Sequence, residues 1–114
     1  MAVILTNRRS DGVSSAEQVV VIWQIINNDH SASVSDHLLI DSTVSGIVIE
    51  MPANPVLGNS VYFLDMAGNC SNYNVTISGS GKKIMGLSES YYINSDEAHF
   101  SLVYSNETYG WRIY

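Results

Sequence analysis

The stretch MPANPVLGNSVYFLDMAG, residues 51–68, constrains the fold more than any other part of this sequence. Pro52 and Pro55 fix φ near −65° and lack an N–H group, so residues 51–59 are predicted to form a shaped connection rather than a helix or a central strand. Residues 61–66 then alternate between two sides with a period of two, which predicts a strand. We interpret the stretch as scaffold and assign that role to Pro52, Pro55, Gly58, Phe63 and Gly68.

Short alternating segments of the same kind recur along the rest of the chain. Clear examples are residues 47–51, 74–78 and 98–104, with Gly, Asn, Ser and Asp filling the turns between segments. No helix longer than one turn is needed after residue 30. This spacing predicts an all-β domain, either a small antiparallel β-sandwich or a partly open barrel. A chain of 114 residues can bury enough surface to fold without a metal ion or a disulfide. We therefore predict that it needs no cofactor.

The segment EQVVVIWQIIN, residues 17–27, is the most apolar part of the chain, and its period is ambiguous. Helical spacing would place Val19, Ile22 and Ile26 on one face, but the β-branched residues favour a strand. A strand that is apolar on both sides needs cover on both sides, and the second cover could come from another subunit. We therefore divide the chain into residues 1–28, an arm and apolar strand for attachment or oligomerisation, and residues 29–114, a β-domain. The residues predicted to contact another subunit or partner are Val3, Ile4, Leu5, Val19, Val21, Trp23, Ile25, Tyr109 and Trp111.

Charge and hydropathy exclude several classes of partner. The net charge is −6, from eleven acidic against five basic residues, so no concentrated basic face is available for nucleic acid. The longest apolar run, residues 19–26, is too short to cross a bilayer. The apolar start of the chain is followed, not preceded, by the basic pair Arg8 and Arg9, which argues against a signal peptide. We expect a soluble protein that is made in the cytoplasm.

No pattern in the sequence predicts a catalytic or metal site. The three histidines, His30, His37 and His99, are too far apart to define a metal site by their spacing. Cys70 is the single cysteine, which excludes an internal disulfide, and it lies in a polar loop without an activating neighbour in sequence. We predict that the protein is not an enzyme.

The last part of the chain is rich in aromatic residues, and two interpretations of them stay open. The residues are Tyr91, Tyr92, Phe100, Tyr104, Tyr109, Trp111 and Tyr114. The alternation of Phe100 and Tyr104 on one side of a predicted strand favours packing in the core or at a subunit interface. The alternative is a carbohydrate-binding module in which these rings stack on the sugars of a host glycan.

The residues from about 33 to 111 resemble a domain of tailed bacteriophages, found in the baseplate wedge protein that carries the short tail fibres and in tailspikes. The matching residues, in order, are Leu39-Ile40-Asp41, Val48-Ile49-Glu50-Met51-Pro52, Pro55-Val56-Leu57-Gly58-Asn59, Val61 to Asp65, Gly68-Asn69, Val75-Thr76-Ile77, Gly81, Ile84-Met85-Gly86, Phe100 to Tyr104 and Gly110-Trp111. The resemblance implies a small β-domain that forms a homotrimer and serves as a docking or spacer module without an active site. We therefore expect a structural protein of the virion, in the tail, baseplate, fibre or capsid, with other virion proteins as partners.

Overall fold

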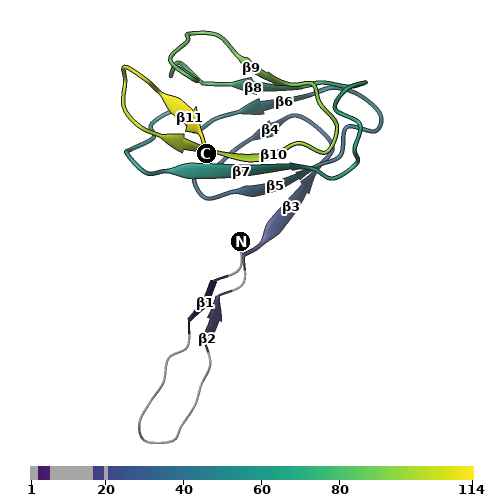
Figure 1. Ribbon diagram of the computed structural model, residues 1–114, viewed down its shortest axis with the longest axis horizontal. Coiled ribbons are helices and arrows are strands. Elements are labelled where there is room, and N and C mark those ends of the chain that lie inside the picture. Colours follow the sequence, from purple (N-terminus) through teal and green to yellow (C-terminus); the bar gives the residue numbers. More distant parts are fainter. Residues whose placement is uncertain (1–2, 6–16, 20) are drawn as a thin grey trace, which may run out of the picture.

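The computed structural model describes residues 3–5, 17–19 and 21–114, and within them the chain is all-β, with no helix (Figure 1). This confirms the predicted fold class. The strands are β1 (Val3–Leu5), β2 (Glu17–Val19), β3 (Trp23–Ile26), β4 (His30–Ser31), β5 (His37–Ile40), β6 (Ile47–Glu50), β7 (Ser60–Asp65), β8 (Val75–Ser78), β9 (Tyr91–Ile93), β10 (His99–Tyr104) and β11 (Trp111–Ile113).

Two sheets lie face to face as two layers (Figure 1). The five-stranded sheet has the order β11-β10-β7-β5-β3, and the four-stranded sheet has the order β4-β6-β8-β9. Among the described residues, strands β1 and β2 pair with each other as a third sheet of two strands. Figure 1 draws this sheet beyond the N-terminal end of β3. The side chains of Val3, Ile4, Leu5 and Val19 lie outside the part of the chain whose side chains the structure describes.

From β3 to β8 the chain alternates between the two layers, and each return places a new strand beside the previous strand of the same layer. We call each pair of successive strands a rung: β3 with β4, β5 with β6, and β7 with β8. Because all rungs run in the same direction, their strands pair in parallel, as in β5 with β7 and β6 with β8. The prediction of a purely antiparallel sandwich is therefore wrong, and both larger sheets are mixed.

The third rung is closed by antiparallel strands, which we call the C-terminal cap: β9, β10 and β11. β9 turns back along β8, β10 pairs with β7, and β11 pairs with β10. Gly110 directly precedes β11 with a φ of 67°, and a Cβ at this position would overlap the Lys83 carbonyl oxygen. Because the Trp111 amide also donates to that carbonyl, at 2.8 Å, only glycine lets the chain approach so closely.

The core lies between the two layers and follows the predicted alternation. In β7, Val61, Phe63 and Asp65 point inward and are buried, while the residues between them are half-buried. In β6, Ile47 and Ile49 are likewise buried and alternate with exposed neighbours. The predicted strands over residues 47–51 and 61–66 are confirmed, and the proline stretch between them contains no strand.

The apolar segment at residues 17–27 is not one continuous strand, which corrects the prediction. It contains β2 and β3, and only β3 joins the five-stranded sheet, through a parallel pairing with β5. Ile26 is buried, whereas Ile22 and Ile25 are 78% and 63% exposed. The four-residue strand lies at the edge of its sheet, and within the described residues its only strand partner is β5.

Candidate functional site

The outer face of the five-stranded sheet carries a row of ring side chains, which we call the aromatic row: Trp23, His37, Tyr62 and Tyr114. The strand register places Trp23 beside His37 and His37 beside Tyr62. Tyr62 is paired with Ser101, and Ser101 exchanges two backbone hydrogen bonds with Tyr114, of 3.3 and 3.0 Å. The row faces outward because its members alternate along the strands with inward-facing core residues.

The rings of the row contact one another across the strands. His37 stacks on Tyr62, with a centroid distance of 4.0 Å and an interplanar angle of 14°. Trp23 meets His37 edge-on at 4.9 Å, and Tyr114 meets Tyr62 in the same manner at 6.4 Å. His37 is therefore buried between its neighbours, and its Nδ1 lies 2.9 Å from the Ser35 carbonyl oxygen. The row is a set of rings held in place by direct contact.

A cluster of hydroxyl groups lies at the Tyr114 end of the row. The Tyr114 hydroxyl lies 3.1 Å from the Tyr62 hydroxyl and 3.2 Å from the Ser60 hydroxyl, within hydrogen-bond distance of both. The hydrogen bond with Tyr114, followed by burial, raises the pKa of Tyr62. Hydrogen bonds with Ser60 and Tyr62 lower the pKa of Tyr114. These groups are thus arranged to exchange hydrogen bonds with a polar ligand.

The row borders a shallow hollow of about 480 Å³ on the same face of the sheet. Its lining residues are Trp23, Tyr62, Phe63, Leu64, His99, Phe100, Ser101 and Tyr114. None of them is Asp, Glu, Lys or Arg. The hollow therefore combines apolar surface with neutral hydroxyl groups and one imidazole.

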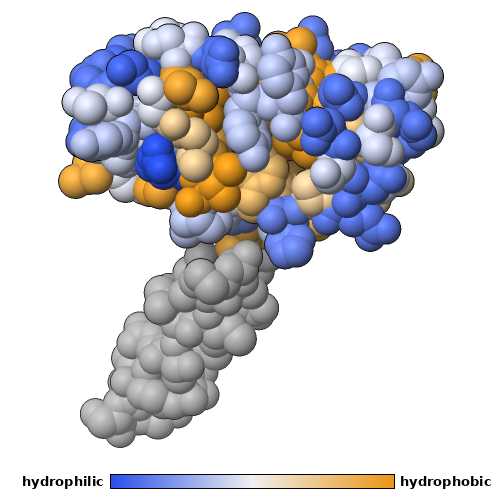
Figure 2. Space-filling model, turned by 45° about the horizontal axis from the view of Figure 1, so that its top comes forward, coloured by the Kyte–Doolittle hydropathy of each residue, from blue (hydrophilic) through white to orange (hydrophobic). Residues whose placement is uncertain are grey.

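The first rung leaves a free sheet edge next to the row. β3 is the last strand of its sheet, so in the part of the chain that the structure describes no strand pairs with its outer edge. Ile22 and Ile25 are exposed there, and Figure 2 shows that apolar atoms gather in patches on the body instead of spreading evenly. The edge offers both unpaired backbone groups and apolar side chains.

The interior of the first rung is closed by a group of polar side chains, which we call the polar end cluster: Gln24, His30 and Asp36. The Gln24 amide donates to Asp36 Oδ1 at 3.1 Å, and His30 Nε2 lies 3.3 Å from Asp36 Oδ2. The Ser33 amide also donates to Asp36 Oδ2, at 2.9 Å. Gln24 is paired with the buried Leu38 on the neighbouring strand, so its side chain lies on the inward side of the sheet. Polar groups thus end the core on this side.

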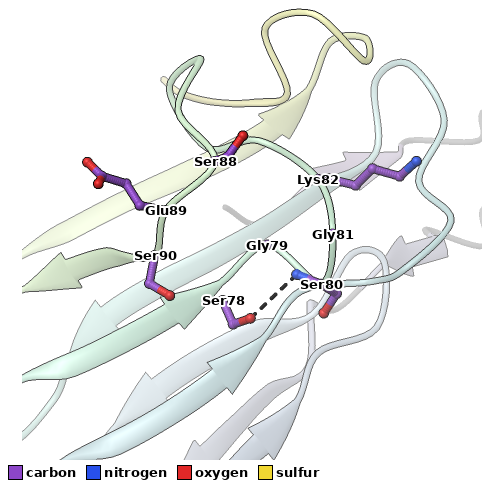
Figure 3. A pocket seen from close by; sticks show the side chains of 8 residues that line it. All are labelled: Ser78, Gly79, Ser80, Gly81, Lys82, Ser88, Glu89 and Ser90. Carbon is purple, nitrogen blue, oxygen red and sulfur yellow. Dashed lines mark hydrogen bonds between the residues drawn. The ribbon is translucent and has the colours of Figure 1, made fainter.

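A second hollow, of about 230 Å³, lies between the turn after β8 and the chain leading to β9 (Figure 3). It is lined by Ser78, Gly79, Ser80, Gly81, Lys82, Ser88, Glu89 and Ser90. In Figure 3 the side chains of Lys82 and Glu89 point away from each other and away from the serines between them. Lys82 Nζ instead pairs with Glu107 Oε1 at 2.6 Å. Neither charged lining residue therefore converges on this hollow with the serine hydroxyls, and the Ser80 hydroxyl donates instead to Glu50 Oε2 at 3.1 Å.

Asp65 anchors the corner where the third rung meets the C-terminal cap. Its buried carboxylate accepts hydrogen bonds from the amides of Gly68 (3.0 Å), Cys70 (3.3 Å) and Glu97 (2.9 Å). Burial raises the pKa of Asp65, but the hydrogen bonds from the Glu97 and Cys70 amides outweigh it, and the pKa lies below its ordinary value. The carboxylate is a structural anion that organises two loops.

Cys70, predicted to lie in a polar loop, is fully buried beside this corner. The Ser42 hydroxyl lies 3.8 Å from its sulfur. Burial raises the pKa of the Cys70 thiol to about 11, so the group stays protonated at neutral pH and is a poor nucleophile. The cysteine belongs to the core of the chain.

The predicted site residues fall into different environments. Trp111, predicted as an interface residue, is 0% exposed and packs against Tyr104 at 5.4 Å, so the interface prediction is wrong for this residue. Trp111 is the large inward residue of β11 and fills the core beneath the cap. Tyr109 and Ile25 are exposed, and Val21 is half-buried. The structure brings Trp23 and Ile25 together on β3 and places Tyr109 in the loop before β11.

The residues predicted as scaffold lie in the core and in the turns. Phe63 is buried and stacks on Phe100 at 5.1 Å. Gly58 has a φ of 91° and its amide donates to the Tyr104 carbonyl oxygen at 3.0 Å. Gly68 has a φ of 66° at the corner that Asp65 organises.

Sequence reasoning missed the aromatic row. Its members come from four separated segments, and only the parallel register of the rungs aligns Trp23, His37 and Tyr62. The available signal was that Tyr62 alternates with the inward-facing Phe63 and must therefore face outward. Among the described residues, no group of three or more His, Cys, Asp or Glu side chains is placed to hold a metal ion.

Comparison with known proteins gives no family assignment: no protein-family model matches the chain, and no curated protein sequence matches it either. A search of the described residues finds no helix with the length and hydropathy needed to span a membrane.

Proposed function

We propose that this chain is a non-enzymatic structural protein of a bacteriophage virion, a homotrimeric module that docks or spaces parts of the tail, baseplate, fibre or capsid. The observation that carries the proposal is the free edge of β3, with its exposed Ile22 and Ile25. Monomeric proteins usually protect sheet edges by shortening them, charging them or covering them. The β3 edge is short, but it carries no charged residue, and no strand covers it in the described part of the chain, so it is suited to contact another protein.

The proposed contact between copies consists of the β3 edge and the arm that precedes it. The other free edges belong to β4, β9 and β11, which contain two or three residues, whereas β3 contains four. Backbone groups on such an edge can pair with a strand of a neighbour, and apolar side chains on either side add burial. Of the predicted interface residues in the arm, Val19 lies shortly before this edge in the sequence, and Val3, Ile4 and Leu5 form the strand β1 that pairs with β2.

The ordered resemblance to the phage domain supports the virion part of the proposal. The matching residues fall in the strands and turns that build the core, such as Ile49 in β6, Phe63 in β7 and Leu102 in β10. A series of core positions with the same order and spacing favours a shared scaffold. In this interpretation the scaffold is rigid and the segment before it determines the attachment partner.

Analytical ultracentrifugation of the full chain at micromolar concentration tests the proposal. We expect a species of about three times the 12.5 kDa chain mass. Ile25→Lys should dissociate it, because a charge would be buried at the contact. Val44→Lys is a matched control, since Val44 is also an exposed apolar residue but belongs to the connection between β5 and β6 and not to the β3 edge. A monomeric wild-type chain, or equal effects of both variants, would contradict the proposal.

The virion assignment has its own test. In a cryo-EM map of the phage particle that encodes this chain, we expect threefold density that fits the two-layered body at a junction between particle parts. Absence of the chain from purified particles, checked by mass spectrometry, would contradict the assignment even if the chain were trimeric in solution.

A further inference from the structure

We propose that the aromatic row is a binding site for a neutral oligosaccharide, laid across the strands of the five-stranded sheet. The inference does not rest on the virion assignment. It starts from the outer face of the sheet, whereas the proposed contact between copies uses the free edge of β3 and Ile25, which lies two residues from Trp23 on the same face.

The chemistry of the lining determines the class of ligand. A pyranose ring has apolar C–H faces and a rim of hydroxyl groups, so it is bound by aromatic rings with neutral hydrogen-bonding groups beside them. The hollow offers the rings of Trp23 and Tyr114 and the edge and hydroxyl of Tyr62, one face of which His37 covers, together with the Ser101 hydroxyl and the His99 imidazole. Since no lining residue is Asp, Glu, Lys or Arg, there is no fixed charge to select a phosphate, a carboxylate or a charged peptide.

The geometry of the row favours a chain of sugars over a single sugar. Trp23 and Tyr114 lie at opposite edges of the sheet, on β3 and directly after β11. The ring centroids from Trp23 through His37 and Tyr62 to Tyr114 are 4.9, 4.0 and 6.4 Å apart, so the row extends beyond the length of a single sugar ring. Tyr62, on the central strand β7, lies between the two outer rings. A linear oligosaccharide can contact all three rings at once, while a single sugar cannot.

The row is also ordered before any ligand binds. His37 is held between Trp23 and Tyr62, and the Tyr62 and Tyr114 hydroxyls already lie 3.1 Å apart. Prior ordering reduces the entropy that a ligand must remove on binding. Tyr114 is 60% exposed, so its ring remains available to a ligand despite these contacts.

The test is a glycan array, followed by NMR titration of the full chain with cellohexaose, maltohexaose, chitohexaose, mannohexaose and the matching disaccharides. We expect at least one hexasaccharide to shift the resonances of Trp23, Tyr62 and Tyr114, and to bind about tenfold or more tightly than its disaccharide. Tyr114→Ala should weaken this binding about tenfold or more. Tyr92→Ala is the matched control, because Tyr92 is 57% exposed but lies on β9 in the other sheet, and it should bind as the wild type does.

Three outcomes would overturn the inference. One is that no glycan on the array or in the titrations binds. Another is that Tyr114→Ala and Tyr92→Ala bind equally well. The third is that Tyr114→Ala dissociates an oligomer in ultracentrifugation while no glycan binds, which would make the row a protein interface. Loss of the trimer in Ile25→Lys with glycan binding retained would support the inference and would separate it from the contact between copies.

Discussion

The two ends of the stack of rungs are finished in different ways. At one end the C-terminal cap adds antiparallel strands, and the indole of Trp111 fills the core beneath them. At the other end the polar end cluster of Gln24, His30 and Asp36 closes the interior, and β3 keeps a free edge. A stack of repeated strand pairs needs its ends closed. Here one end is closed by additional strands, and the other is closed only on the inside.

The difference separates stability from interaction in this molecule. The buried aromatic residues at the capped end, Tyr104 and Trp111, face inward, and changing them should destabilise the fold. Apolar residues at the first rung, such as Ile22 and Ile25, face outward, and changing them should alter contacts with other molecules. The following predictions test this separation, from the largest expected effect on stability to the smallest.

Removing the large core residue at the capped end should have the greatest effect. We expect Trp111→Ala to lower the free energy of unfolding by about 3–5 kcal/mol, because it leaves a cavity where the indole was buried. Urea denaturation followed by circular dichroism measures the change. Trp23→Ala is the matched control and should cost far less, since Trp23 is partly exposed at the opposite end. Equal losses would contradict the proposed difference between the ends.

The Asp65 corner joins the third rung to the cap. The contribution of the Asp65 carboxylate to the free energy of unfolding should depend on pH. We expect Asp65→Asn to cost roughly 1.5–3 kcal/mol at pH 7, because a buried acceptor of three amide hydrogen bonds loses its charge. The pKa of Asp65 is lowered in the folded state, so its stabilisation is present above the unfolded-state pKa and is lost as pH falls through the folded-state pKa.

Urea denaturation of the wild type and Asp65→Asn at pH 7 and in steps below about pH 4 checks this dependence. The gap between the two proteins should narrow as the wild-type carboxylate takes up a proton. Asp29→Asn, in the loop before β4, serves as a control with an exposed carboxylate. A gap that stays constant with pH would mean that charge on Asp65 is not what holds the corner.

Disrupting the polar end cluster should have an intermediate effect. Asp36→Ala removes the common acceptor of the Gln24, His30 and Ser33 groups, and we expect a loss of about 1 kcal/mol. The change should be local, so amide hydrogen exchange should accelerate in β3 and β4 but not in β10. Faster exchange across the whole body would contradict an independent closure of the first rung.

The smallest effect on folding is expected at the free edge. Ile25→Ser should change the free energy of unfolding of the isolated chain by no more than about 0.5 kcal/mol, because the side chain is largely exposed. Thermal denaturation below the association concentration measures this. A loss as large as that of Asp36→Ala would show that Ile25 packs within its own chain.

Much of the fold followed from the sequence because a period of two identifies a strand and its inward face. Val61 and Phe63, or Ile47 and Ile49, were assigned to the core by this pattern and are buried there. The pattern carries no information about which strand lies alongside, so the parallel pairing of β5 with β7 and the passage between layers were not predictable. Partner choice depends on contacts between residues far apart in the chain.

The errors at individual residues have the same origin. Trp111 was predicted as an interface residue, yet the bridge from residue 84 and the cap bury it. Cys70 lies among polar neighbours in sequence, but the amide hydrogen bond to Asp65 turns its loop inward. The aromatic row required the full register before its members could be recognised as neighbours.

The alternation between layers also constrains how the chain can reach its native state. Every parallel pair joins distant residues: the closest is β3 with β5, where Trp23 meets His37, and β6 meets β8 as far along as Ile47 with Val75. Each pairing therefore closes a long loop before it gains any hydrogen bonds. Folds dominated by such distant pairings fold in roughly milliseconds to seconds, and we expect this chain to do the same. Local turns cannot act as a nucleus for the rungs. The last rung and its antiparallel cap, where β10 and β11 meet across a short loop, are the natural place for folding to begin, and the first rung then joins a body that is already formed.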